Sequence, residues 1–474
     1  MEEERDFFLE SREQQKLVNR FERMVRERQQ VFFDVHELEN IIDFYLDGDH
    51  HEKAHKAITY ARKMHPGSVE LRLKHAQWLY DREKYNEAKQ LLITLEKLDI
   101  TNSDIFLLLG NIFSMEGNFD RAADKYREAI RYAGDDVCEI LLAIALNFEH
   151  FDLFPKAVEY LEKAMEIDKS FIPALFELAY CHDKTGNNAE SIRLYQEYLD
   201  ADPYCQDAWY NIGTVFSKMG QSAEAIESYD FAIALDDTFG SAYFNKANTL
   251  VNIERYEEAI GVYEDYIGIT GSSSDVLCYI GECYEKLEMY DKAEAFYNRS
   301  LDEDENYADG WYGIGIILFY RCDYEKCLEY VKKAISIDEA HPEYWFTLGQ
   351  AYEKLELWND ALSAFRLASD LDPFDEEIWL LMSELLSKND RTDEAIDMLK
   401  HGLLYNESAR INFRLAACHA YLCQRNEAEK HFIAALKIDA DKNSVFFENC
   451  NNTDFNDSFS TLVSNYLKKS KNEL

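Results

Sequence analysis

The residues that could do metal chemistry stand together in the string HEKAH at residues 51–55, which matches the HExxH pattern of zinc proteases. On a helix, its two histidines share a face and can bind Zn²⁺, and Glu52 can act as the general base. The string has no HxxGxxH extension, and His50 is the only imidazole next to it. A metal-dependent hydrolase is therefore one hypothesis, which the surrounding sequence must support or replace.

The ten cysteines form no CxxC pair. Three pairs are separated by five residues, which is about 500° around a helix, so the two thiols of each pair point in different directions. The chain also lacks the G-x-S-x-G, Walker A and GxGxxG patterns of hydrolases and nucleotide-binding enzymes. We therefore predict that the protein is not an enzyme and has no catalytic residue, metal or cofactor.

Charge excludes a further class of function. The 474 residues include 50 Lys and Arg against 91 Asp and Glu, a net charge of −41. A phosphate backbone would be repelled by most of such a surface, so we expect no nucleic-acid partner. Apolar residues make up 47%, which is enough for a large core.

We expect a cytoplasmic protein without membrane insertion. The N-terminus MEEERDFFLE has no basic segment followed by an apolar one, as a signal peptide would. The longest nearly apolar run, 310–320, is too short to span a bilayer as a helix. The cysteines are then read as reduced thiols, most of them packed in the core.

A period of 34 residues organises the chain, and it explains the HEKAH string differently. One small residue recurs at spacings of 34, 34 and 35, then 34 seven times, then 33: Ala54, Ala88, Ala122, Ala157, Ser191, Ala225, Ala259, Ala293, Cys327, Ala361, Ala395 and Ala428. We number this residue position 20, so that repeats begin at 35, 69, 103, 138, 172, 206, 240, 274, 308, 342, 376 and 409. In this register His51 occupies position 17, where other repeats carry Tyr or Phe, so the string is better explained as structural.

Other positions are restricted in the same register. Position 4 carries Trp209, Trp311, Trp345 and Trp379; position 8 carries Ala or Gly in ten repeats; position 24 carries Tyr126, Tyr195, Tyr229, Tyr263, Tyr297 and Phe365. Positions 4, 7, 8 and 11 have the spacing of one apolar helix stripe, and small residues at 8, 20 and 27 let helix axes approach closely. No proline falls in a predicted helix interior, because each lies between repeats or in the first turn of a helix.

These positions resemble the tetratricopeptide repeat family, with twelve repeats over 35–442. The resemblance implies an all-α fold, an α-solenoid forming a right-handed superhelix of helical hairpins. The ends of such an array need caps. We predict an N-terminal capping helix within 1–34, over 10–31, and a C-terminal segment 443–474 in which a loop over 443–453 precedes a second capping helix over 454–469.

The resemblance also implies a concave groove for peptides, lined by the first helix of each repeat. Positions 5, 6 and 9 lie opposite the core stripe. In repeats 5–10 they form an aromatic ladder beside asparagines. The predicted peptide-binding residues are Phe176, Tyr180, Tyr210, Asn211, Thr214, Phe244, Asn245, Asn248, Tyr279, Glu282, Tyr312, Ile316 and Phe346. Aromatic rings offer contact area at low entropy cost, and Asn amides can pair with a peptide main chain.

Two functional hypotheses remain beside the hydrolase. The leading one is a non-catalytic interaction scaffold that binds a protein or peptide segment in the groove. Acidic residues at position 2 of eight repeats would form an edge that steers a basic partner. The other is a regulatory subunit of an oligomeric assembly, docking through an apolar patch of repeat 9 around Gly313 (Tyr312, Ile316, Phe319 and Tyr320). The identity of the partner, the pathway and the oligomeric state do not follow from the sequence.

Overall fold

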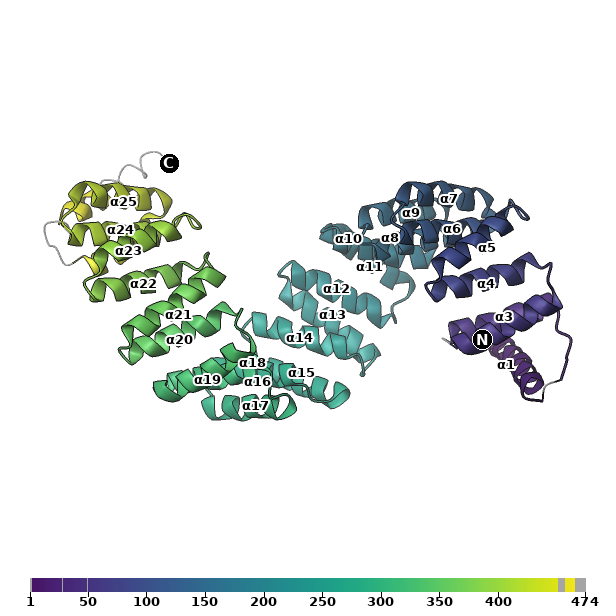
Figure 1. Ribbon diagram of the computed structural model, residues 1–474, viewed down its shortest axis with the longest axis horizontal. Helices are drawn as coiled ribbons and strands as arrows, with labels where there is room; N and C mark the ends of the chain where they lie inside the picture. Colours follow the sequence, from purple (N-terminus) through teal and green to yellow (C-terminus); the bar gives the residue numbers. More distant parts are fainter. Residues whose placement is uncertain (1, 28, 49, 451–456, 465–474) are drawn as a thin grey trace. The chain divides into compact units, whose positions relative to one another are not determined.

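The computed structural model describes residues 2–27, 29–48, 50–450 and 457–464, with side-chain environments from residue 14. Contacts divide the chain into two compact units, one ending at Asp237 and the other beginning at Thr238. Within the described residues, α2–α25 form twelve pairs of consecutive helices and there is no strand. The predicted all-α solenoid of helical hairpins is therefore confirmed (Figure 1).

The first unit contains thirteen α-helices in its described residues. They are α1 (Glu2–Glu27), α2 (Val35–Asp47), α3 (His51–Met64), α4 (Val69–Asp81), α5 (Tyr85–Glu96), α6 (Ser103–Met115), α7 (Phe119–Tyr132), α8 (Val137–His150), α9 (Phe154–Ile167), α10 (Ile172–Lys184), α11 (Asn188–Ala201), α12 (Gln206–Lys218) and α13 (Ser222–Leu235), with a 3₁₀ turn η1 (Gly134–Asp136) before α8. Each even-numbered helix from α2 on is the first of its repeat and packs against the odd-numbered helix that follows.

The second unit continues the same pairing. Its helices are α14 (Gly240–Asn252), α15 (Tyr256–Thr270), α16 (Ser274–Lys286), α17 (Tyr290–Glu303), α18 (Ala308–Tyr320), α19 (Tyr324–Ile337), α20 (Pro342–Lys354), α21 (Trp358–Leu371), α22 (Glu376–Lys388), α23 (Thr392–Gly402), α24 (Ala409–Tyr421), α25 (Arg425–Ile438) and α26 (Ser444–Asn449), with a 3₁₀ turn η2 (Ala440–Asn443) before α26. Among the helices described in both units, none combines the length and the apolar run that a membrane crossing requires.

Position 20 supports the repeat register. All twelve residues at this position have 0% exposure, from Ala54 in α3 to Ala428 in α25. The one hydroxyl among them, on Ser191, donates to the carbonyl of Ala179 at 2.7 Å, so that no polar group is buried without a partner there. The prolines Pro155, Pro173 and Pro342 lie in the first turns of α9, α10 and α20, as predicted.

The tryptophans at position 4 tie each inter-repeat turn to the helix that follows. The indole Nε1 of Trp311 donates to the carbonyl of Glu305 at 2.8 Å, and that of Trp345 to the carbonyl of Glu339 at 2.9 Å. Trp209 makes the same bond to the carbonyl of Pro203, six residues before it. A large apolar ring thus fills the core while its single donor satisfies the turn.

Two boundaries differ from the prediction. α1 covers residues 2–27 rather than 10–31; Val18, Phe21 and Met24 on it are buried, whereas Val25 is exposed. The chain leaves the helix before Val31 because the Val31 carbonyl accepts a hydrogen bond from Tyr60 Oη of α3 at 2.6 Å.

At the other end, 444–449 form α26 rather than the predicted loop. The ring of Phe446 is buried against Phe432 with ring centroids 4.9 Å apart, and this tertiary contact stabilises a segment that is rich in Asn. Residues 457–464 of the predicted second capping helix are helical. The rest of that helix, Phe455 and Tyr466 included, lies outside the described residues.

Candidate functional site

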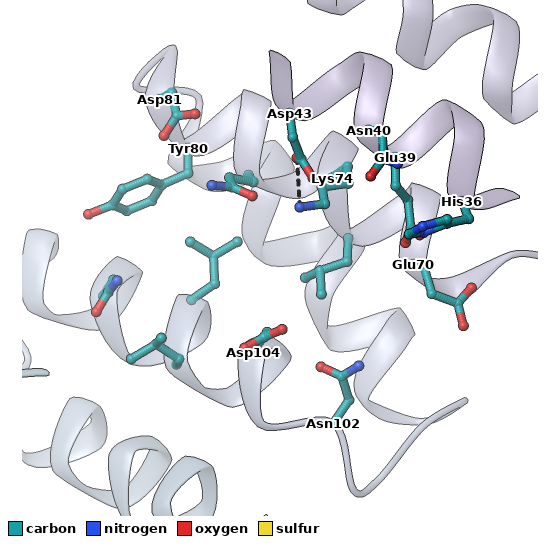
Figure 2. A pocket seen from close by; sticks show the side chains of 15 residues that line it. His36, Glu39, Asn40, Asp43, Glu70, Lys74, Tyr80, Asp81, Asn102 and Asp104 are labelled. Carbon is teal, nitrogen blue, oxygen red and sulfur yellow. Dashed lines mark ion pairs between the residues drawn. The ribbon is translucent and has the colours of Figure 1, made fainter. Parts of the chain in front are cut away.

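The first helices of repeats 1–3 enclose a groove in the first unit. This N-terminal groove has a volume of about 560 Å³ and is lined by residues of α2, α4 and α6 (Figure 2). The lining residues are His36, Glu39, Asn40, Asp43, Glu70, Leu73, Lys74, Gln77, Tyr80, Asp81, Asn102, Asp104, Leu107, Leu108 and Asn111. With the exception of Asn102, which caps α6, they occupy positions 2, 5, 6, 9, 12 and 13 of their repeats, a set that includes the concave positions 5, 6 and 9.

The electrostatics of the N-terminal groove are dominated by acids. Five carboxylates face one lysine, and Lys74 Nζ already lies 2.7 Å from Asp43 Oδ1. Desolvation raises the pKa of Asp104, an effect that Lys74 opposes and Asp136 reinforces. Desolvation likewise raises the pKa of Glu39 and of Asp81. The groove therefore holds more negative charge than its own cations neutralise.

A second groove of the first unit contains part of the predicted site. This middle groove, of about 670 Å³, is lined mainly by α8, α10 and the start of α12. It brings together Phe176, Tyr180 and Asn211 from the predicted set with the apolar side chains of Leu142 and Leu146. An aromatic and aliphatic surface beside an amide suits a peptide that inserts side chains and pairs its main chain.

A pair of carboxyl groups lies on the same helices. Burial first, and then the charge of Glu149 and a hydrogen bond to it, raises the pKa of Glu177 to about 7. Cys181 Sγ donates to Glu149 Oε1 at 3.2 Å, and burial beside that carboxyl raises the pKa of the thiol. Glu177 thus takes up a proton near neutral pH beside the Glu149 carboxyl, and Cys181 is kept as a thiol.

The other predicted residues of the first unit make internal contacts. Thr214 Oγ1 donates to the carbonyl of Tyr210 at 3.0 Å within α12. The ring of Tyr210 lies 6.0 Å from the ring of Tyr229. Both side chains are half-buried on α12, the helix that carries Asn211, and neither is among the residues that line the middle groove.

In the second unit, the predicted residues of α14 and α16 form an aromatic cluster. The ring of Tyr279 lies 6.1 Å from Phe244 and 6.0 Å from Tyr263. The Tyr263 hydroxyl donates to Oδ1 of Asn248, so the amide oxygen that we assigned to a peptide has a partner within the repeat. The amide nitrogen and the second lone pair of the amide oxygen of Asn248 remain for the predicted role.

Glu282 is the acidic member of the predicted set. It is exposed on α16, yet desolvation by the surrounding side chains, with the charges of Asp309 and Glu285, raises its pKa to about 7. Carboxylates thus crowd the first helices of the second unit as they do in the N-terminal groove. The predicted Asn245 and Phe346 are half-buried on α14 and α20.

The apolar patch of repeat 9 largely packs within the second unit. Tyr312 is half-buried, with its hydroxyl 3.0 Å from Thr347 Oγ1 and its ring 4.7 Å from that of Tyr344. Gly313 is covered by Tyr297, whose Cζ would lie 2.4 Å from a Cβ at position 313. Ile316 and Phe319 are half-buried, which leaves Tyr320, 56% exposed, as the most accessible ring of the patch.

The HEKAH string lies on α3 beside Trp78. The ring of His55 stacks on Trp78 at 4.5 Å, and Trp78 Nε1 donates to the carbonyl of His51 at 3.1 Å. Cationic Lys53, Lys56 and Arg82 line the same surface hollow. Their charges oppose a divalent cation, and within the described ranges no three His, Cys, Asp or Glu side chains are grouped as metal ligands.

The N-terminal groove was not predicted from the sequence, because few of its residues are the aromatic residues expected at the concave positions. The signal was present in another form. Positions 5, 6 and 9 of repeats 1–3 carry acids, amides and leucines, among them Glu39, Asn40 and Leu73. A search for charged and amide side chains at the same positions would have found it.

Comparisons with known proteins agree with the repeat register. Family models described as tetratricopeptide repeat match residues 73–137, 173–203, 207–239, 240–272, 274–307, 308–341 and 342–375. The "Probable UDP-N-acetylglucosamine--peptide N-acetylglucosaminyltransferase SPINDLY" of Hordeum vulgare is 26% identical over 150 residues, 30% of this chain and 16% of that protein. The "BBSome complex member BBS4" of Bos taurus is 24% identical over 119 residues, 25% of this chain and 22% of that protein. The chain therefore spans less than a quarter of the length of these relatives.

Solved structures match this chain at low sequence identity and with TM-scores below 0.5. A tetratricopeptide repeat protein from Parabacteroides merdae has 15% identity and a TM-score of 0.43, covering 52% of this chain and 98% of that chain. The Cut9–Hcn1 hetero-tetramer of the APC/C has 15% identity and a TM-score of 0.39, covering 84% and 89%. YrrB, described as having an unusual peptide-binding site, has 22% identity and a TM-score of 0.32, covering 40% and 97%.

Proposed function

Because the chain belongs to the tetratricopeptide repeat family, we propose that it is a non-catalytic scaffold that binds an extended segment of a partner protein on the concave faces of its first helices. The observation that carries this proposal is the pair of grooves in the first unit, of about 560 and about 670 Å³. Both are lined mainly by first helices of successive repeats, and both combine apolar side chains with a few amides and acids, as binding sites for peptides do.

The chain would recognise the peptide in two ways, by apolar contacts to its side chains and by hydrogen bonds to its main chain. In the middle groove, Leu146 and Tyr180 offer apolar contact and Asn211 offers an amide at the groove edge. In the second unit, Asn245 and the amide nitrogen of Asn248 would pair with the main chain of a segment anchored on Tyr279. The partner in this proposal is a protein, because the negative charge disfavours nucleic acid.

We do not extend the transferase activity named for the barley relative to this chain, because the match covers 16% of that protein. The ten cysteines are all free thiols, which fits a reducing compartment. We therefore propose the cytosol as the site of action.

Selection of peptides from a displayed random library against the full chain tests the proposal. Peptides recovered with wild type should lose affinity for the double variant Tyr180→Ala with Asn211→Ala, by about tenfold for the loss of an aromatic anchor and an amide. The matched control is Tyr204→Ala, since Tyr204 is 78% exposed and does not line the groove. Binding should be unchanged in that control.

The second readout is the melting profile, which should show that both variants remain folded. Peptides that bind wild type and the double variant with equal affinity would show that the middle groove is not the binding site. Recovery of no peptide at all would contradict peptide binding as the function of the chain.

A further inference from the structure

The N-terminal groove differs from the middle groove in its charge. It presents five carboxylates, Glu39, Asp43, Glu70, Asp81 and Asp104, from three successive first helices. We propose that this groove binds a basic segment of a partner protein, with Arg or Lys side chains placed among these carboxylates. The proposal rests on the proposed function, peptide binding on the concave face, and adds the chemistry of the occupant.

The first argument is that the cations of the groove do not neutralise it. Lys74 is the one lysine of the lining, and its Nζ is engaged with Asp43 Oδ1 at 2.7 Å (Figure 2). His36 Nδ1 lies 3.9 Å from Glu39 Oε2 and is charged only when protonated. With His36 neutral, five negative charges and one positive charge leave a net charge of −4. A cationic ligand would restore the balance.

The second argument comes from where the raised carboxyl pKa values lie in the chain. Among the residues that the structure describes, seven carboxyls have a raised pKa, each through desolvation first: Glu39, Asp81, Asp104, Glu149, Glu177, Glu282 and Glu285. All seven are on first helices. Three of them line the N-terminal groove, more than line any other pocket described for the chain.

Three glutamates on second helices have a lowered pKa instead. Hydrogen bonds from Arg193, Arg255 and Arg391 lower the pKa of glutamates one turn away, at Glu190, Glu258 and Glu394. These three arginine–glutamate pairs lie on second helices, whereas the N-terminal groove holds five carboxylates and one lysine. Repulsion and desolvation of these carboxylates lower the free energy of unfolding, and a bound cationic partner would raise it again.

The third argument is the shape and polarity of the lining. Leu73, Leu107 and Leu108 provide apolar contact between the acids, and Asn40 and Gln77 provide amides. The side chains of Arg and Lys have an apolar stem and a charged end, so the stem can lie on the leucines while the end reaches a carboxylate. The amides can pair with the peptide main chain. A bare metal ion would use the acids alone.

Fluorescence anisotropy with the full chain tests the proposal. The probes are three labelled peptides of equal length, an Arg-Ser repeat, a Gln-Ser repeat and a Glu-Ser repeat. The groove variant carries Glu39→Gln, Asp81→Asn and Asp104→Asn. These changes keep side-chain volume and remove desolvated charges, so the variant should melt no lower than wild type.

The matched control removes the same charge elsewhere. Glu159→Gln, Glu162→Gln and Glu166→Gln change three exposed residues of α9, a second helix of the same unit. The Arg-Ser peptide should bind wild type and the α9 control with affinities within about twofold, and the groove variant about tenfold more weakly or worse. The Gln-Ser and Glu-Ser peptides should bind wild type far more weakly than the Arg-Ser peptide.

Two results would overturn the proposal. Equal loss of affinity in the groove variant and the α9 control would show attraction to net charge rather than to the groove. Binding of the Gln-Ser peptide as tight as that of the Arg-Ser peptide would show that charge does not select the occupant. Failure of the proposed function looks different, since the displayed library would then yield no peptide of any charge.

Discussion

Gly110 on α6 lies directly against the ring of Tyr126 on α7, and a Cβ at position 110 would be 2.3 Å from Cε1 of that ring. The relationship recurs between positions 8 and 24 of other repeats. A Cβ would lie 2.8 Å from Tyr229 at Gly213, 2.7 Å from Tyr297 at Gly281, and 2.6 Å from Phe365 at Gly349. In these repeats a buried ring therefore occupies the volume that the glycine leaves open.

Gly281→Ala should lower the stability of the second unit. The methyl group would meet the Tyr297 ring, which is 1% exposed and has little space to move, and such overpacking costs about 1–3 kcal/mol. Gly261→Ala on α15 is the control, because nothing lies within 4 Å of a Cβ there and alanine favours a helix by about 0.8–1 kcal/mol. Thermal unfolding should show midpoints that move in opposite directions. A shift of both in the same direction would contradict this assignment of the packing.

The repeat register and the hairpin architecture could be predicted because they depend on spacing. The turn between the two helices could not. Position 15 adopts positive φ in described repeats 2–12, and eight of these residues are not glycine: Glu83, Asp152, Glu254, Glu288, Cys322, Glu356, Asp390 and Cys423. Only at Gly117, Gly186 and Gly220 does the residue type predict a positive φ at this position. Elsewhere, helix packing on both sides imposes the turn on residues that do not favour it.

The candidate site was predictable only in part. Helical periodicity placed Phe176, Tyr180 and Asn211 on one face, and they line the middle groove together. Periodicity does not predict which group a side chain will form a hydrogen bond with. The amide oxygen of Asn248 accepts a hydrogen bond from the Tyr263 hydroxyl, and the Tyr312 hydroxyl is hydrogen-bonded with Thr347 Oγ1 of the next repeat. These contacts depend on distances between helices, which residue types alone do not specify.

Glu177→Gln should stabilise the first unit at high pH and not at low pH. The folded pKa of Glu177 is about 7, above its ordinary value of 4.5, so the folded state binds this proton more tightly than the unfolded state. Stability from this group is therefore present below pH 4.5 and lost as pH rises through 7. Gln is always neutral, so the variant should melt higher than wild type at pH 8 and similarly at pH 4. Glu162→Gln, at an exposed position, is the control. An equal shift at both pH values would exclude the titration of Glu177 as the cause.

Thiol labelling should divide the ten cysteines by exposure. Cys322 and Cys423 are exposed at position 15 of their repeats, Cys205 is half-buried, and the other seven are buried. Under native conditions an alkylating reagent should modify Cys322 and Cys423 first and Cys205 more slowly. Cys181 and Cys278 should react far more slowly than these three, because burial raises the pKa of each thiol and lowers its thiolate fraction. Peptide mapping by mass spectrometry reads the order, and early modification of Cys181 would contradict the packing of α10.

Arg414→Ala should release α26 from the last repeat. Arg414 is 6% exposed, donates from Nε to Ser383 Oγ of α22 at 2.9 Å, and donates from Nη1 to Asn449 Oδ1 of α26. Its loss leaves polar groups without partners in a buried site, at a cost of about 1–3 kcal/mol. Arg410→Ala is the control, since Arg410 pairs with Glu376 and Glu377 while 32% exposed, and exposed pairs contribute about 0.2–1 kcal/mol. Limited proteolysis should cut within 444–449 faster in Arg414→Ala than in wild type or Arg410→Ala. Equal rates in the two variants would mean that the contacts of Phe446, rather than Arg414, hold the segment in place.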